Sequence, residues 1–173
     1  MRFFLDTEFI DDPVRCRIDL ISIAISSEDG RSYYAVSLDF DPSNAGDWVK
    51  KNVLPKLPPR PDSPGRVPTP SLWKTRAQIK AEILEFVGRD APEFWGYFAD
   101  YDWVAFCWLF GSMENLPKHF PMYCRDIKQL MDSLGVERIP FNPDQEHDAR
   151  SDAEWNRKAF TWLMSAGAKV RRA

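Results

Sequence analysis

The sequence predicts an α/β fold in which helices flank one mixed five-stranded sheet. Three observations predict it: an alternating apolar run joined to a second β-prone run by an Asp-Gly turn, strand and helix patterns that alternate in the second half, and a long amphipathic C-terminal segment. The chain has 173 residues, near the usual size of one domain of roughly 100–200 residues. We therefore expect residues 1–173 to form a single domain.

The first three predicted strands form an antiparallel meander. Residues 2–5 are a short apolar run, and residues 18–26 alternate between isoleucines and small side chains with the period of two that is typical of a strand. Asp29-Gly30 follows and is a strong hairpin signal, so residues 32–38 are expected to form the return strand.

A proline-dense segment follows a short predicted helix at 44–54. Residues 55–70 contain seven of the chain's 14 prolines, and prolines exclude both helix interior and central strand. We expect a surface loop there, which is either a tolerated insertion or a flap over substrate. In the second case Lys56, Arg60 and Arg66 would be able to contact phosphate.

Strand and helix patterns alternate over the rest of the chain. Thr75 is a predicted N-cap for a helix over residues 76–88, and residues 93–98 are predicted to form a buried strand. The remaining predicted elements are a helix at 102–110, a strand at 122–125, a helix at 127–134 and a final helix from about 148 to 166.

Composition narrows the classes of function. A net charge of −3 and a pI of about 5.4 argue against a protein that coats nucleic acid with a broad basic face, but they allow an enzyme that grips a few terminal nucleotides. Three scattered cysteines predict neither a disulfide framework nor a zinc site. The N-terminus reads as neither signal peptide nor membrane span, so we expect a cytoplasmic protein without a membrane partner.

Three groups of acidic or histidine side chains lie at the ends of predicted elements. Asp6 and Glu8 are two apart on a strand and therefore share a face. Taken alone, such a pair is more often two solvated acids, and Asp102 at a strand-to-helix junction could be a helix N-cap, as could Asp100. The same junction also lies where active sites of open α/β sheets collect.

The third group is His147 with Asp152, at the start of the final predicted helix. The chain has only 2 histidines, and His147 could be merely an exposed polar residue before a helix. The ordered occurrence of all three groups strengthens the functional explanation. Carboxylates rather than thiolates predict the hard cations Mg²⁺ or Mn²⁺.

These motifs resemble those of DEDD-type 3′→5′ exonucleases of the RNase H-like fold, in the branch whose last motif supplies histidine (DEDDh). The matching residues, in order, are Asp6 and Glu8, Asp102 after Tyr101, and His147 with Asp152. The tyrosine branch does not fit, because Asp148 stands where that branch has tyrosine. The family usually has Asn four residues before its second-motif Asp, where this chain has Phe98.

The compact length, the DTEFI start and the W-x-x-x-A-x-Y-D stretch resemble those of small actinobacterial exoribonucleases related to RNase T, some described as acting on polyadenylate. The resemblance implies two Mg²⁺ or Mn²⁺ ions per active site and release of nucleoside 5′-monophosphates from single-stranded RNA or RNA 3′ ends. It also implies that Asp6 bridges both ions, that Glu8 and Asp152 complete one site, that Asp102 holds the other and that His147 is the general base.

Three further residues are candidates for substrate binding. Thr7 and Phe9 flank Glu8, and Phe9 could pack on the terminal base or anchor its loop. Trp103 could stack on a base, or belong to the apolar stripe of its helix with Phe106.

Alternatives to an exoribonuclease remain open from sequence. One is a DNA-directed 3′→5′ exonuclease, and another is a catalytically silent RNA-binding module on the same fold. The resemblance to RNase T-like enzymes also implies a possible homodimer in which one subunit helps to bind the substrate of the other.

Overall fold

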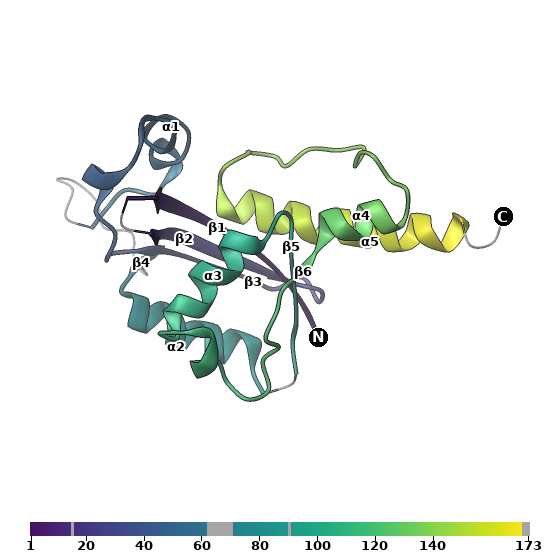
Figure 1. The fold of residues 1–173 in the computed structure, drawn as a ribbon, viewed down its shortest axis with the longest axis horizontal. Coiled ribbons are helices and arrows are strands. Elements are labelled where there is room, and N and C mark those ends of the chain that lie inside the picture. Colours follow the sequence, from purple (N-terminus) through teal and green to yellow (C-terminus); the bar gives the residue numbers. More distant parts are fainter. Residues whose placement is uncertain (15, 62–70, 90, 171–173) are drawn as a thin grey trace.

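The computed structural model describes residues 1–14, 16–61, 71–89 and 91–170, and it contains one mixed sheet of six strands in the order β4-β3-β2-β1-β5-β6 (Figure 1). The strands are β1 (Arg2–Asp12), β2 (Arg17–Ser27), β3 (Ser32–Ser37), β4 (Trp73–Lys74), β5 (Glu93–Gly96) and β6 (Arg125–Asp126). The first three are antiparallel, and β4, β5 and β6 each add in parallel to a neighbour. The predicted mixed α/β class is confirmed, and the sheet is compatible with an RNase H-like fold.

The predicted number of five strands was wrong by one. The additional strand, β4, consists of two residues that pair with Val36 and Ser37 of β3. Two residues are too few to carry an alternating pattern, so no local signal distinguishes this strand from the loop before it. The last strand is also displaced from the predicted 122–125, since β6 begins at Arg125.

The first strand is longer than predicted, and this matters for the site. The first strand was expected to end at residue 5. In the structure, β1 continues to Asp12 because it pairs with β2 along its whole length. Asp6 and Glu8 therefore lie within a hydrogen-bonded strand, opposite Ala24 and Ser22. A register shift follows directly after Glu8, and such irregularities re-aim the side chains around them.

The described residues form five α-helices around the sheet. They are α1 (Asp47–Asn52), α2 (Arg76–Val87), α3 (Asp100–Leu109), α4 (Ile127–Ser133) and α5 (Ala149–Val170), with short 3₁₀ turns at Pro42–Asn44, Leu54–Lys56 and Met113–Asn115. Thr75 caps α2 as predicted and forms a capping box with Gln78. The side chains from residue 166 onward, including the last position of the predicted apolar stripe of α5, lie outside the described part.

The helices divide between the two faces of the sheet (Figure 1). α2 and α3 cover the face to which Phe3 and Leu5 point, and α4 and α5 cover the face to which Phe4 points. Because side chains alternate along a strand, the continuation of β1 directs Asp6 and Glu8 toward α5 and Thr7 toward α3.

The parallel neighbour of β1 is short, which opens one edge of β1 at the site. β5 pairs with β1 only as far as Phe4 and then turns into α3 through Gly96. A Cβ on Gly96 would lie 2.7 Å from the Cβ of Ala99 and 3.2 Å from the carbonyl oxygen of Leu5. Only glycine therefore allows the chain to turn this close to β1.

Two expectations fall partly outside the described residues. Of the proline-rich segment 55–70, residues 62–70 lie outside them, and so does Arg66. Within the described ranges, the structure contains no helix with the length and apolar character needed to cross a membrane.

Candidate active site

Three carboxylates converge between β1 and the first turn of α5. Asp6, Glu8 and Asp152 each offer a carboxylate oxygen, and these oxygens lie within 4.8 Å of one another. The two strand residues come from one face of β1, and α5 packs on that face. Asp6 and Asp152 are about 145 residues apart in sequence, and this packing places them side by side. The structure therefore brings together the first and third predicted motifs.

Asn156 fixes the position of α5 over β1. It is 1% exposed, and its side-chain amide donates a hydrogen bond of 2.9 Å to the carbonyl oxygen of Leu5. Asp152 lies one helical turn before Asn156, and Asp6 directly follows Leu5. Sequence reasoning missed this residue, although a polar side chain among the apolar positions of α5 was a usable signal.

Asp102 reaches the site from the opposite face of the sheet. Its Oδ1 accepts hydrogen bonds from the backbone N–H of Thr7 at 2.7 Å and from the Thr7 hydroxyl at 2.6 Å. The backbone N–H of Thr7 lies beyond the end of the pairing with β5, and Asp102 supplies the acceptor that a neighbouring strand would otherwise provide. The alternative acid, Asp100, is exposed and lies outside the cavities that contain Asp102 and Asp6.

His147 lies just before α5 in a left-handed backbone conformation, with φ of 57°. The backbone N–H groups of His147 and Asp148 lie close enough to the Asp152 carboxylate to lower its pKa. The imidazole meets the Trp48 ring edge-on, with ring centroids 4.7 Å apart. Trp48, on α1, was not predicted as a site residue.

Lys56, in the 3₁₀ turn after α1, also lies at the site. Its Nζ donates to the backbone carbonyl of Glu146, next to His147, and its charge lowers the pKa of both Glu8 and Asp152. If the proline-rich segment were a flap, Lys56 was expected to be able to contact phosphate; the structure places it beside the carboxylates. Arg60, by contrast, lies over the Trp73 ring at 5.2 Å.

The clustered carboxyl groups have raised pKa values. Burial and repulsion from Asp102 and Asp152 raise the pKa of Asp6 well above its ordinary value, and the same causes raise the pKa of Glu8 to about 8. Burial raises the pKa of Asp102 to about 6 against the hydrogen bonds from Thr7, and burial raises that of Asp152 to about 6. A bound cation would relieve this repulsion.

Two cavities meet at the cluster. The first, of about 410 Å³, contains the carboxylates with Thr7, Phe9, Trp48 and His147. Phe9 stacks on Tyr101 with ring centroids 5.6 Å apart. The structure does not bring Trp103 to this site: it is 9% exposed and stacks on Phe106 in the core.

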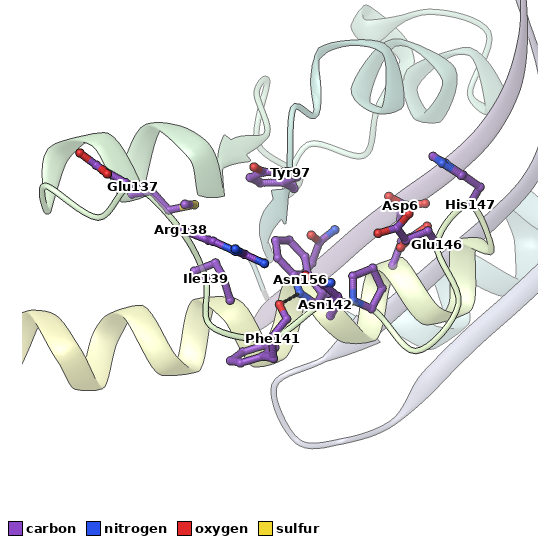
Figure 2. A pocket seen from close by; sticks show the side chains of 14 residues that line it. Asp6, Tyr97, Glu137, Arg138, Ile139, Phe141, Asn142, Glu146, His147 and Asn156 are labelled. Carbon is purple, nitrogen blue, oxygen red and sulfur yellow. Dashed lines mark hydrogen bonds between the residues drawn. The ribbon is translucent and has the colours of Figure 1, made fainter.

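The second cavity, of about 440 Å³, also has His147 in its wall (Figure 2). It shares Asp6, His147 and Asp152 with the first. Its other walls come from the loop between α4 and α5 and from the end of β5, and they include Tyr97 and Arg138. Sequence reasoning assigned no role to this loop.

Comparison with known proteins identifies the family. Residues 1–164 match the family described as 3′-5′ exoribonuclease Rv2179c-like domain. The chain belongs to this family. It is also 44% identical over 168 residues to 3′-5′ exoribonuclease Rv2179c of Mycobacterium tuberculosis H37Rv, covering 95% of this chain and 94% of that protein. The same figures hold for 3′-5′ exoribonuclease MT2234.1 of M. tuberculosis CDC 1551.

The segment that matches the Rv2179c-like family contains both cavities. It extends beyond Asp152 and Asn156, so it includes the three clustered carboxylates and the hydrogen bond from Asn156 to Leu5. The family thus groups this chain with exoribonucleases over the whole of the site.

Proposed function

We propose that this protein is a metal-dependent 3′→5′ exoribonuclease of the DEDDh type that releases nucleoside 5′-monophosphates from single-stranded RNA or RNA 3′ overhangs. The observation that carries the proposal is the convergence of Asp6, Glu8 and Asp152 within 4.8 Å beside His147. Membership of the Rv2179c-like exoribonuclease family supports RNA, rather than DNA, as the substrate.

The donor set fits hard divalent cations. Carboxylate oxygens within 4.8 Å of one another can share one cation that takes oxygen ligands at about 2.0–2.6 Å. Burial, and after it repulsion from the neighbouring carboxylates, raises the pKa of Glu8 and of Asp6, and a cation between the carboxylates would offset both effects. We assign Asp6, Glu8 and Asp152 to one ion, and Asp6 with Asp102 to a second; the ions are Mg²⁺ or Mn²⁺.

The bound ions would lower the pKa of water and neutralise charge on the phosphate and the departing 3′-oxygen. A ring nitrogen of His147 accepts the proton of the attacking water. The water oxygen joins phosphorus as the bond to the 3′-oxygen of the preceding nucleotide breaks. The released nucleotide therefore carries a 5′-phosphate, and the departing 3′-oxygen takes a proton from solvent, which leaves a 3′-hydroxyl on the shortened strand.

Surrounding residues hold these groups in place. Thr7 fixes one oxygen of Asp102, and Asn156 fixes α5 so that Asp152 faces Asp6. Phe9, backed by Tyr101, offers an aromatic surface to the terminal base in the first cavity.

The decisive experiment is digestion of 5′-labelled single-stranded RNA and matched DNA with Mg²⁺ or Mn²⁺. We expect a ladder that shortens from the 3′ end of RNA and is absent with EDTA, in Asp6→Asn and in His147→Ala. A protein that binds RNA but releases no nucleotide with any metal would be the silent binding module. Faster digestion of DNA would identify a DNA-directed exonuclease.

We further propose that the protein forms a homodimer. The exposed face of α3 supports this, because Tyr101, Val104 and Trp108 are at least 38% exposed and lie at helical spacing along one side. Sedimentation equilibrium measures the mass directly: a dimer that dissociates in Trp108→Glu supports the proposal, and a monomer at all concentrations contradicts it.

A further inference from the structure

The second cavity borders the carboxylates but has no part in the chemistry proposed above. It lies between the loop that joins α4 to α5 and the aromatic side chain of Tyr97 (Figure 2). Its volume of about 440 Å³ is within the range of about 300–1,000 Å³ that is usual for ligand sites. It shares Asp6, His147 and Asp152 with the first cavity, so the two cavities adjoin at the carboxylates.

The walls of this cavity have the chemistry of a nucleotide site. Tyr97 offers a ring that Trp155 holds edge-on, with centroids 5.0 Å apart and planes at 69°. A ring held in this way is a stacking surface for a base. Asn142, Glu137 and Glu146 lie on the rim, where amide and carboxylate oxygens can accept hydrogen bonds from the amino groups of a base.

Arg138 supplies the positive charge that a phosphate needs. It is exposed on the loop and extends into the space between Tyr97 and α5 (Figure 2). Within the described ranges no carboxylate or hydrogen-bond acceptor engages its guanidinium. An unpaired guanidinium beside a carboxylate cluster is well suited to a phosphate dianion or diester, because its planar donors match the phosphate oxygens.

Resting on the proposed exonuclease function, we propose that this cavity binds the nucleotide on the 5′ side of the scissile phosphate. Tyr97 stacks on its base and Arg138 contacts its 5′-phosphate. The scissile phosphate has to lie at the carboxylates, so the nucleotides on its two sides extend in opposite directions. The first cavity then receives the terminal nucleotide that is released.

The course of the strand decides which cavity takes which nucleotide. An upstream nucleotide is attached to more RNA and needs a way out to solvent, whereas a terminal nucleotide does not. The second cavity is bordered by exposed loop residues and adjoins, across Phe141, a shallow hollow on α5 with Lys158 at its edge. The first cavity lies against α1, which contributes Trp48 and Val49 to its wall.

The test compares two substrates that differ only upstream of the scissile bond. Single-stranded oligouridylate fills both cavities, and the p-nitrophenyl ester of uridine 5′-monophosphate carries one nucleotide and a small leaving group. We expect Arg138→Ala to lower the ratio of kcat/KM for RNA to kcat/KM for the ester about tenfold, the loss of roughly one charge-assisted hydrogen bond. Arg138→Glu should lower it further.

Salt dependence gives a second readout that a structural role would not change. Loss of one phosphate contact should reduce the slope of log(kcat/KM) for RNA against log[salt] by about 0.7. Arg89→Ala is the matched control, since Arg89 is an exposed arginine after α2 and lines neither cavity. It removes the same charge and should change neither the ratio nor the slope.

The outcomes separate this inference from the proposed function. If wild type cleaves both substrates and Arg138→Ala lowers both equally, or lowers neither, the second cavity is not the upstream site and only this inference fails. If Arg89→Ala changes the ratio and the salt slope as much as Arg138→Ala does, the effect of Arg138 is one of general charge, and the inference is likewise overturned. A wild type that cleaves neither substrate with any metal overturns the exonuclease and this inference together.

Discussion

The side-chain amide of Asn156 donates a hydrogen bond to the carbonyl oxygen of Leu5, and this contact joins α5 to β1 at the level of the carboxylate cluster. Asp6 is the next residue along β1, and Asp152 lies one turn earlier on α5. One buried hydrogen bond therefore aligns two carboxylates that are far apart in sequence. The convergence of the acids depends on this alignment as much as on the acids themselves.

Asn156→Leu should destabilise the fold and impair the site. It leaves the Leu5 carbonyl buried without a donor, which costs about 1–3 kcal/mol, and it frees α5 to shift relative to β1. Urea denaturation measures the first effect and kcat on RNA the second. Asn44→Ala, at an exposed position, should change neither quantity; unchanged stability in Asn156→Leu would show that the bond has no structural role.

Thr7→Val should lower activity because it removes the hydroxyl that holds Asp102. The hydrogen bonds from Thr7 lower the pKa of Asp102 against the effect of burial, so the acidic limb of the pH–rate profile should move to higher pH. We expect kcat/KM at pH 6 to fall about tenfold. Thr7→Ser keeps the hydroxyl and should restore the wild-type profile, and a failure of this rescue would contradict the explanation.

Without divalent metal, thermal stability should decrease as pH rises from about 4 to 8. Folding raises the pKa of Glu8 to about 8 and the pKa values of Asp102 and Asp152 to about 6. A carboxyl with a raised pKa binds its proton more tightly when folded, so its contribution is complete below the unfolded pKa of about 4 and is lost as pH rises through the folded value.

Tm measured in EDTA at several pH values checks this prediction. Mn²⁺ should raise Tm more at pH 8 than at pH 5, because it replaces the lost protons. In Asp6→Asn the decrease should be shallower, since one member of the repelling cluster no longer titrates. A Tm that rises with pH in EDTA would mean that the acids do not repel one another in the folded protein.

Phe98→Asn should stabilise the protein. Phe98 has a φ of 54° and is 62% exposed, and a bulky side chain is strained in this region, whereas Asn tolerates it. We expect a gain of about 0.5–1 kcal/mol in the free energy of unfolding, measured with urea. Phe98→Ala loses the same ring contact with Tyr97 but, unlike Asn, is not favoured at positive φ, so it should not be stabilised; equal gains in both variants would exclude strain as the cause.

Local patterns in the sequence predicted most elements correctly. The alternation at 18–26 and the turn at Asp29-Gly30 are properties of neighbouring residues, and the structure confirms the hairpin of β2 and β3. The cap at Thr75 is equally local and is confirmed. The end of β1 was predicted wrongly because pairing with β2, a non-local contact, keeps the acidic residues in the strand.

For the aromatic residues near the acids, local sequence patterns do not predict which rings are buried and which are exposed. Phe9, Tyr101 and Trp103 are all large rings beside motif residues, and each could pack or bind. Tyr101 is exposed and stacks on Phe9, while Trp103, two residues later on α3, turns into the core against Phe94. The rotation of α3 against the sheet decides this, and it depends on contacts between segments that are far apart in sequence.

The sequence by itself determined most of the element types and the order of the three acidic motifs, because these follow from residue types and short spacings. Only the tertiary structure decided that Asp102 is held by Thr7, that Asn156 aligns α5, and that a second cavity lies beside His147. These features depend on side chains from distant segments that meet when the sheet faces are covered, and no local spacing encodes which atoms will then be neighbours.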